Sequence, residues 1–315
     1  MNELKAVQPC LLSIAICTRN RAQLLYECLK ALHGQLVDMH DVQVLVVDNG
    51  STDDTRRVLA DFSSRFPHWL GVKEPEVGLS HARNQALAST GADWIAFLDD
   101  DAKPLAGYVS RLKALASEGS FDCVAGVYLP WYRDGRKPWF RDSYASNVSS
   151  IQRFGDLPVG IHASGGNFLL RKQAALDAGG FRSELGMAGS RRAYGEETRL
   201  QIELRRKGRR IGGDPELLVE HLTAMPKQSL CAILHSAWSV GRDHWATFDE
   251  YPTAGVMLGR VRRLLSRPLL ALYKELFRQS ERCSWQSVVL AIGRPLVMTF
   301  GELSEGMRLI FGRRQ

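Results

Sequence analysis

The chain has 315 residues, of which 45% are hydrophobic and 24% are charged, values typical of soluble globular proteins that exclude a mainly disordered chain. The net charge of +7 is uneven, because residues 222–315 carry 13 Lys+Arg against 7 Asp+Glu while residues 1–221 carry 28 against 27. The six cysteines are scattered without a C-x-x-C pair and follow no secretory signal, so we expect no disulfide framework and no zinc knuckle. The expected environment is the reducing cytosol.

Short apolar runs alternate with helical patterns through the first 120 residues. The runs at 11–16, 42–47, 70–72 and 94–98 predict strands, and the patterns at 21–32, 54–66, 79–89 and 104–117 predict helices, the last with Pro104 in its first turn. Strict alternation of this kind is typical of a doubly wound α/β fold with a mainly parallel central sheet.

The regular pattern ends after Tyr128, in an aromatic and basic stretch that reads LPWYRDGRKPWFRDSYASN. Its aromatic side chains could stack on an acceptor sugar, although burial in the core is the favoured interpretation; they are Trp131, Tyr132, Trp139 and Phe140. Order resumes at 167–181, followed by a helix over 194–208 that closes at Gly208 and a strand over 216–221.

Beyond residue 221 the pattern is helical and basic. Amphipathic helices are predicted at 258–282 and 285–311, which suggests two domains, 1–221 and 222–315. The most apolar segment, 285–300, is interrupted by Arg294-Pro295, so no membrane span is expected. The basic surplus indicates either an ordinary solvated helical region or peripheral contact with an anionic membrane surface; no nucleic acid partner is expected.

Polar clusters directly follow three of the predicted strands. They are Cys17-Thr18-Arg19-Asn20-Arg21 after the first strand, Asp48-Asn49-Gly50-Ser51 after the second, and Asp99-Asp100-Asp101 after the fourth. Ligands of open α/β sheets bind outside the carboxyl ends of the strands, so this edge is predicted to be a binding site.

The motifs at this edge restrict the ligand. No G-x-G-x-x-G follows the first strand and no G-x-x-x-x-G-K-[ST] occurs, which argues against a nicotinamide dehydrogenase and a P-loop NTPase. In an extended segment Asp99 and Asp101 project to the same side, where two carboxylates suit Mg²⁺ or Mn²⁺. Such a cation usually completes its shell with substrate phosphate, so a diphosphate ligand is predicted.

Several segments, in order along the chain, resemble the family 2 glycosyltransferases, which have the GT-A fold. The resemblance covers about residues 11–221 and rests on LLSIAICTRNRAQLLYECLKAL, VQVLVVDNGSTDDT, EVGLSHARNQALASTGADWIAFLDDD, GGNFLLRK, GGF and YGEETRLQIELRRKGRRIGGDPELLVEH. It implies a Rossmann-like, nucleotide-sugar-binding domain followed by the helical region.

The resemblance implies a role for each group at the sheet edge. Asp48 would read the nucleotide base, Arg83 would lie near the nucleotide, and the nucleoside would contact Thr18, Arg19 and Asn20. The D-x-D-like element, Asp99 to Asp101, would bind the ribose and the metal. Asp99 and Asp100 would contact the donor, and the metal ligands would be Asp99, Asp101 and His221. Such enzymes often have Pro-Thr-Tyr-Asn-Arg where this chain has Cys17 to Arg21; the Arg19 plane could still stack on the base.

The resemblance also implies a general base in the segment before the last strand. The family carries a Glu-Asp pair there, so Glu197 is the predicted base and Glu196 the reserve. The loop 186–192 is interpreted as either a lid or a plain flexible loop, and Gly165-Gly166-Asn167 is expected near the sugar or acceptor.

The predicted function is therefore inverting, metal-dependent glycosyl transfer with Mn²⁺ or Mg²⁺. The favoured donor is a UDP-sugar and the acceptor is a saccharide or lipid-linked hydroxyl, in cell-surface polysaccharide or glycoconjugate synthesis. The expected location is the cytoplasm, with peripheral contact at the inner face of the membrane. Two alternatives stay open, a sugar nucleotidyltransferase and a degenerate transferase acting as a scaffold for polysaccharide assembly; the sugar, the linkage and the oligomeric state are not predicted.

Overall fold

The computed structural model describes residues 11–37, 39, 41–66, 68–189, 191–277 and 283–312, which fall into two compact units. The sheet unit comprises Met1–Trp131, Asp142–Glu184 and Glu197–Leu222, and the helical unit comprises Tyr132–Arg141, Leu185–Glu196 and Thr223–Gln315. Each unit draws on three separate segments of the chain. The two domains suggested by the sequence, 1–221 and 222–315, stay a prediction.

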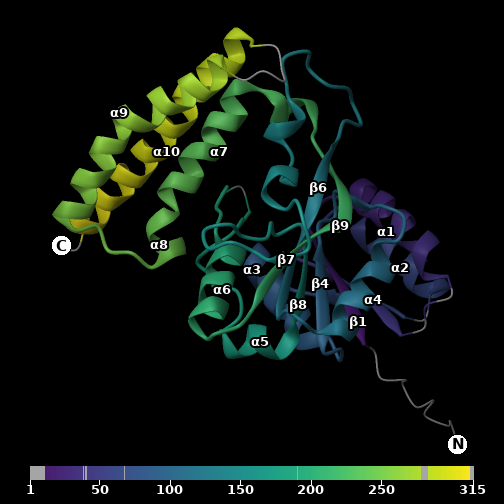
Figure 1. Cartoon of the computed structure of the whole chain (residues 1–315). Helices are drawn as coiled ribbons and strands as arrows, with labels where there is room; N and C mark the ends of the chain where they lie inside the picture. The colour runs from purple at the N-terminus through teal and green to yellow at the C-terminus, as the bar shows by residue number, and fades with distance from the viewer. Residues whose placement is uncertain are drawn as a thin grey trace, which may run out of the picture. The chain divides into compact units, whose positions relative to one another are not determined.

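One mixed sheet forms the centre of the sheet unit (Figure 1). Its hydrogen-bonded order is β3-β2-β1-β4-β8-β6-β9-β5, with β7 beside β9. The strands β1, β2, β3, β4, β6 and β9 run in one direction, and β5, β7 and β8 run in the other. Their bounds are β1 Leu12–Thr18, β2 Val42–Asp48, β3 Trp69–Lys73, β4 Trp94–Leu98, β5 Ala102–Pro104, β6 Cys123–Trp131, β7 Gly155–Asp156, β8 Asn167–Arg171 and β9 Ile211–Leu222.

Helices cover both faces of this sheet. On one face lie α1 (Ala22–Leu36), α2 (Thr55–Arg65) and α4 (Tyr108–Glu118), and on the other lie α3 (Leu79–Ser89), α5 (Lys172–Asp177) and α6 (Glu196–Arg206). Successive strand side chains point to opposite faces, so Ile14 and Ile16 pack in the first core whereas Ala15 packs in the second. The prediction of an α/β fold with a mainly parallel sheet is confirmed.

The segment after the aspartates differs from its prediction. The helix expected at 104–117 begins at Tyr108, and Pro104 ends the short strand β5. Gly107 precedes the helix with φ 84°, a left-handed conformation that glycine adopts at low cost. A three-residue strand shows no periodicity, so the sequence gives no signal for β5.

The second half of the sheet contains longer strands than the sequence indicates. The strand β6 continues to Trp131, inside the predicted irregular stretch, and β9 begins five residues before the predicted run at 216–221. The segment between β6 and β8 contains the short 3₁₀ helices Asp142–Tyr144 and Val148–Ser150. The five cysteines in the described residues are all free.

The helical unit is built around α7 (Leu230–Arg242), α9 (Ala254–Leu276) and α10 (Trp285–Phe311), which pack side by side in Figure 1. The 3₁₀ helix Met225–Gln228 precedes α7, and the short α8 (His244–Phe248) follows it. The predicted helix at 285–311 is confirmed. The one predicted at 258–282 begins four residues earlier, at Ala254, and its last five residues lie outside the described part of the chain.

The helix α10 continues through Pro295, although proline removes a backbone donor. One turn further along the helix, the Thr299 hydroxyl donates to the Pro295 carbonyl at 2.8 Å. Among the described residues, α10 is the one helix long and apolar enough to cross a membrane by length and composition, which is weak evidence taken alone. The expectation that Arg294-Pro295 leaves no such candidate is therefore wrong.

Candidate functional site

Parallel pairing places the ends of β1, β2 and β4 at the same edge of the sheet. Thr18 and Asp48 are partners in the ladder, and both side chains are buried. The Ser51 backbone N–H donates to Asp48 Oδ1 at 2.8 Å, and Arg56 Nε lies 3.9 Å from Asp48 Oδ2. The polar groups that follow these strands in the sequence thus meet in space, as predicted for this edge.

Asp100 is anchored inside the protein. The Thr18 hydroxyl donates to Asp100 Oδ2 at 2.7 Å, and Arg21 Nη1 donates to Oδ1 at 2.8 Å. Burial raises the pKa of Asp100 to about 6, although the nearby Arg21 guanidinium acts to lower it. Both Asp100 oxygens have protein partners, so this residue joins β1 to the aspartate turn. Its predicted contact with the donor stays a prediction.

Asp99, Asp101 and His221 form a cluster beside Asp100. His221 Nε2 lies 3.3 Å from Asp99 Oδ2 and 3.1 Å from Asp101 Oδ1. The strand β4 ends at Leu98, and the Ala102 N–H donates to the Asp99 carbonyl at 3.1 Å, so the aspartates occupy a turn instead of an extended strand. The two carboxylates converge through this turn.

His221 reaches the cluster because β5 pairs with β9. Ala102 and His221 are ladder partners, and the Leu222 N–H donates to the Asp101 carbonyl at 2.9 Å. This antiparallel pairing fixes the histidine opposite the aspartate turn, across 122 residues of sequence from Asp99. A strand of three residues is therefore what brings the third group of the cluster into position.

His221 and the two carboxylates stabilise each other's charged forms, although the carboxylates repel one another. Burial acts to lower the pKa of His221, but the Asp101 and Asp99 carboxylates raise it to about 9. Burial likewise acts to raise the pKa of Asp99, and the hydrogen bond and charge of His221 outweigh it, so that pKa is lowered. A proton on His221 thus balances part of the carboxylate charge that a cation would otherwise balance.

The cluster fits a divalent cation in both donor type and spacing. One atom each from Asp99, Asp101 and His221 lies within 4.8 Å of the others. Octahedral ligands at about 2.1 Å from a metal lie about 3 Å apart when adjacent and about 4.2 Å apart when opposite. Carboxylates suit Mg²⁺ and Mn²⁺, and imidazole is compatible with Mn²⁺.

Two glycines allow the groups of the site to approach one another. A Cβ on Gly166 would lie 2.4 Å from Asp99 Oδ2, and a Cβ on Gly165 would lie 2.5 Å from Arg83 Nη2. Arg83 is buried, donates to the Gly165 carbonyl at 2.9 Å, and lies 3.9 Å from Asp99 Oδ1. The pair Gly165-Gly166 therefore packs directly against a candidate metal ligand and the arginine predicted beside the nucleotide.

Asn167, the third residue of that motif, serves the fold. It is completely buried, and its side-chain amide donates to the carbonyls of Val127 at 3.0 Å and Leu217 at 2.8 Å. The Tyr108 hydroxyl donates to its Oδ1 at 3.1 Å. The sequence places this residue near a sugar, but its polar atoms are used between β6, β9 and α4.

The residues after β1 differ in how firmly they are held. Asn20 has φ 54°, and its Oδ1 accepts from the Thr52 N–H at 2.7 Å, which ties this turn to the start of α2. Arg19 is exposed and has no hydrogen bond or ion pair with any described residue, so its guanidinium is available to a ligand. Arg21 holds Asp100, a role that the sequence analysis did not predict. The one feature of the sequence that points to Arg21 is its place in the Cys17–Arg21 motif.

The two glutamates open α6 as predicted, but in different surroundings. Glu196 is buried and belongs to the helical unit, whereas Glu197 is half-buried and belongs to the sheet unit. Gly195 precedes them with φ 101°, and a Cβ there would lie 2.0 Å from Thr247 Oγ1. The backbone at the helix start is thus tightly packed, and the role of Glu197 as base stays a prediction.

The loop 186–192 contains a tight turn in which Ala188 and Arg191 exchange two backbone hydrogen bonds of 3.3 and 3.0 Å. Ser190 lies outside the described residues, and the lid stays a prediction. Of the predicted aromatic groups, Phe140 is buried as the packing interpretation favours. Trp131 is half-buried and carries Lys103 Nζ 3.4 Å from its ring centroid.

Residues 13–178, more than half of the chain, match the model of the family described as Glycosyl transferase family 2. The succinoglycan biosynthesis protein ExoM of Rhizobium meliloti is 27% identical over 242 residues, 76% of this chain and 75% of that protein. The glycosyltransferase AglE of Haloferax volcanii is 27% identical over 174 residues, 55% of this chain, so the match spans only 56% of that relative's length.

Solved structures show the same fold at low sequence identity. The mannosyltransferase PcManGT from Pyrobaculum calidifontis, in complex with GDP-Man and Mn²⁺, superposes with a TM-score of 0.60 at 17% identity, over 96% of this chain and 88% of that one. S. aureus TarS 1-349 superposes with a TM-score of 0.55 at 16% identity, over 97% and 91% of the two chains. The predicted GT-A fold is confirmed.

Proposed function

Because the chain belongs to glycosyl transferase family 2, we propose that it transfers a sugar with inversion from a nucleotide diphosphate to an acceptor hydroxyl. The observation that carries this proposal is the cluster of Asp99, Asp101 and His221 at the carboxyl edge of the sheet, with Arg83 beside it. Carboxylate ligands and a buried guanidinium together suit the charge of a diphosphate.

The donor is a nucleotide-sugar, with UDP favoured over other nucleotides. Asp48 Oδ2 and the exposed Arg19 supply an acceptor and a planar cation for a nucleobase, and Thr18 holds Asp100 beneath them. Asp99, Asp101 and His221 would hold Mn²⁺ or Mg²⁺. When bound, this cation would neutralise the negative charge of the leaving diphosphate. His221 must give up its proton to act as a ligand.

The second half of the reaction needs a base on the acceptor side. In the proposed step the acceptor oxygen forms a bond to the anomeric carbon, the bond from that carbon to the diphosphate oxygen breaks, and the acceptor proton passes to Glu197. Glu197 is half-buried at the start of α6, where the helix dipole favours the ionised carboxylate. Glu196, which is buried, is the reserve.

The acceptor is a saccharide or lipid-linked hydroxyl in the synthesis of a cell-surface polysaccharide or glycoconjugate. ExoM, by its name, acts in succinoglycan biosynthesis, which supports this class of product. A cytoplasmic enzyme with such an acceptor would work at the inner face of the membrane. We therefore include peripheral membrane contact through the basic region 222–315 in the proposed function.

A donor panel tests this proposal. Isothermal titration calorimetry of UDP-, GDP- and dTDP-sugars, each with Mn²⁺ and with excess chelator, should find one nucleotide class that binds more tightly with metal. Release of nucleoside diphosphate in the presence of a saccharide acceptor would then report transfer. If no nucleotide-sugar binds, or if binding and release are equal in metal and chelator, the proposed metal-dependent transfer is wrong.

A further inference from the structure

The helix α9 carries positive charge with little acidic charge to balance it. Between Ala254 and Leu276 the sequence has the cations Arg260, Arg262, Arg263, Arg267 and Lys274, and its one acidic residue is Glu275. Glu275 is buried and paired with Arg141, whose Nη2 lies 2.7 Å from Glu275 Oε1. The exposed surface of this helix therefore has cations and no carboxylate.

Three of these arginines lie along one side of α9, since positions i, i+3 and i+7 share a helix face. Arg260 is buried and forms ion pairs with two carboxylates, Glu250 Oε2 at 2.8 Å and Glu302 Oε2 at 3.1 Å. Arg267 reaches Glu302 Oε1 only at 4.0 Å, and burial followed by the charge of Arg263 lowers its pKa. Arg263 has no hydrogen bond or ion pair with any described residue.

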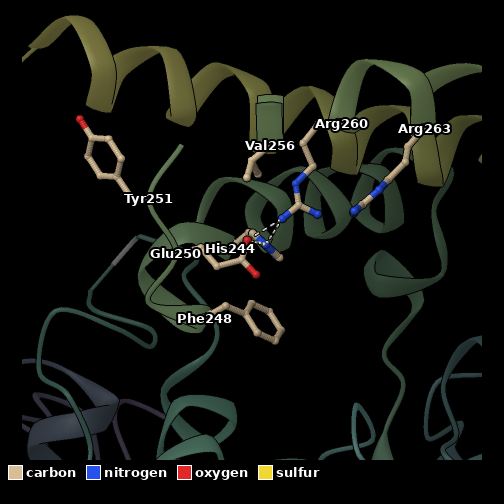
Figure 2. Close-up of a pocket in the computed structure, with 7 residues that line it drawn as sticks. All are labelled: His244, Phe248, Glu250, Tyr251, Val256, Arg260 and Arg263. Atoms are coloured by element: carbon tan, nitrogen blue, oxygen red, sulfur yellow. Dashed lines mark hydrogen bonds and ion pairs between the residues drawn. The ribbon is translucent and has the colours of Figure 1, made fainter. Parts of the chain in front are cut away.

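A pocket of about 530 Å³ opens beside these arginines. Figure 2 shows Arg260 and Arg263 projecting from α9 on the same side, with Val256 from the first turn of the helix and the Phe248 ring opposite. Arg260 Nη2 donates to His244 Nε2 at 2.6 Å, so His244 faces it as a neutral acceptor. The pocket lining thus combines apolar and aromatic side chains with the Glu250 carboxylate, which pairs with Arg260. It also includes the half-buried Arg263 guanidinium, which has no ion pair with a described residue.

The exposed face of α9 next to the pocket is apolar. Leu258, Val261, Leu269, Tyr273 and Leu276 are between 47% and 68% exposed. At about 100° per residue these positions form a single stripe about 120° wide, with Arg262 inside it. Leu270, which is 56% exposed, lies between this stripe and the cations Arg263 and Lys274. An apolar stripe flanked by cations is the arrangement of helices that lie in the interface of a bilayer.

We propose that this helix docks on an anionic membrane, with its apolar stripe in the bilayer interface and a lipid phosphate bound by Arg263 beside the pocket. The inference rests on the membrane contact included in the proposed function, and it names the surface and the lipid group. Charge decides the occupant. In a two-fold dimer formed through this face, Arg262 and its neighbouring cations would meet the same cations of the second copy and repel them. Lipid phosphates would instead neutralise these cations.

Vesicle sedimentation tests the docking surface. The full chain is mixed with vesicles of phosphatidylcholine alone or of phosphatidylcholine with phosphatidylglycerol, and the bound fraction gives a partition coefficient. The wild type should bind the anionic vesicles and lose binding as salt is added. Arg263→Gln should lower the partition coefficient about fivefold, the factor equal to about 1 kcal/mol for one arginine near an anionic surface.

The stripe is tested by Leu269→Ser combined with Leu276→Ser. Burying one leucine is worth about 1.5–3 kcal/mol, so the double variant should bind at least about tenfold more weakly. Matched controls lie in the sheet unit, where Arg153 is an exposed cation and Val159 is 89% exposed; Arg153→Gln and Val159→Ser should bind as the wild type does. Thermal melting of every variant shows whether the fold is kept.

The outcomes separate this inference from the proposed function. If the wild type binds anionic vesicles and the α9 variants bind equally well, the docking surface is wrong while peripheral contact stands. If the wild type binds no vesicles, membrane contact and docking surface both fail, and donor binding is unaffected. Binding of inorganic phosphate at Arg263 without vesicle binding would overturn the lipid assignment, as would self-association that the leucine variant abolishes.

Discussion

At the scale of single residues, the proposed function requires the cluster of Asp99, Asp101 and His221 to exchange a proton for a metal cation. Without a metal, the protonated imidazole lies 3.1 Å from Asp101 and 3.3 Å from Asp99, so the carboxylates are partly neutralised within the protein. In the proposed function, all three groups would bind a metal instead. The aspartates are thus tolerated side by side because either charge balances them.

Asp101→Asn should weaken metal-dependent donor binding, because an amide oxygen carries no charge for the cation and Asp101 is nearly buried. Loss of an outer-shell partner of a metal ligand typically costs on the order of 10–100-fold in metal affinity, and loss of the charge of a ligand itself should cost at least as much. Calorimetry of Mn²⁺ and donor binding measures this change. Asp61→Asn, on an exposed carboxylate of α2 that pairs with Arg65, is the control and should leave binding unchanged.

Glu197→Gln should abolish most transfer while donor and metal still bind, since the amide keeps the shape of the side chain and removes its basicity. Loss of a general base costs on the order of 10²–10⁴ in rate. Glu196→Gln is the matched comparison, and it should lose much less activity as long as its melting temperature is close to that of the wild type. An active Glu197→Gln beside an inactive, folded Glu196→Gln would assign the base to Glu196.

Gly166→Ala should disturb the metal cluster from the outside. The new Cβ would lie 2.4 Å from Asp99 Oδ2 and 2.9 Å from Asp99 Cγ, so the carboxylate must leave its present position, in which Oδ2 lies 3.3 Å from His221 Nε2. We expect weaker Mn²⁺ binding with a small change in melting temperature. Gly91→Ala is the control, because nothing lies within 4 Å of its new Cβ; equal metal affinities for both variants would contradict the argument.

At the scale of secondary structure, local pattern predicts an element only where it is long enough to show a period. The strands β1, β2 and β4 follow from their apolar runs, and helix α3 was expected over its full observed range. The strand β5 has three residues, and Pro104 at its end resembles the start of a helix. Since β5 aligns His221 with the aspartates, the sequence suggests the ligand set only through family resemblance.

Helix packing in the helical unit depends on glycine. A Cβ on Gly301 of α10 would lie 2.6 Å from the Trp238 carbonyl oxygen and 2.9 Å from Arg242 N, both backbone atoms of α7. Gly301→Ala should therefore force the two helices apart. Overpacking of this kind typically costs about 1–3 kcal/mol of unfolding free energy, which urea unfolding at constant pH would measure.

Gly255 and Gly259 on α9 supply the control, because nothing lies within 4 Å of a Cβ at either position. Alanine has the higher helix propensity, by about 1 kcal/mol per residue. Gly255→Ala and Gly259→Ala should thus leave the stability unchanged or raise it. A Gly301→Ala variant as stable as these two would mean that α7 and α10 are not held at this spacing in solution.

At the scale of the whole molecule, the alternation of strands and helices predicts the fold class, but it does not predict which segments pack together. The segments Tyr132–Arg141 and Leu185–Glu196 belong to the helical unit, although the sequence assigns them to the first domain. Their attachment comes from single side chains far away in the sequence: Arg141 bonds Glu275, and the Tyr194 N–H donates to Asp243. The hydrophobic periodicity of the sequence cannot predict such long-range pairs.

The stability of the molecule should fall in acid partly because of His244. This side chain is mostly buried. Burial, and then the charge of Arg260, lower its pKa below the ordinary 6.5, and they outweigh Glu302 and Glu250, which act in the other direction. Below pH 6.5 the unfolded chain takes up a proton at this site that the folded chain does not. The contribution of His244 to stability is thus complete above pH 6.5 and declines as the pH falls toward its folded pKa.

His244→Gln keeps a polar acceptor for Arg260 Nη2, which lies 2.6 Å from His244 Nε2, and removes the titration. Urea unfolding of wild type and variant across the acid range measures the difference between their unfolding free energies. That difference should shift with falling pH in favour of the variant, and level off once both states of the wild type are protonated. Groups such as Asp100 titrate in both proteins and cancel. His235→Gln, at an exposed histidine of α7, is the control. A difference that does not change with pH, or that shifts in favour of the wild type, would mean that His244 is charged in the folded protein beside Arg260.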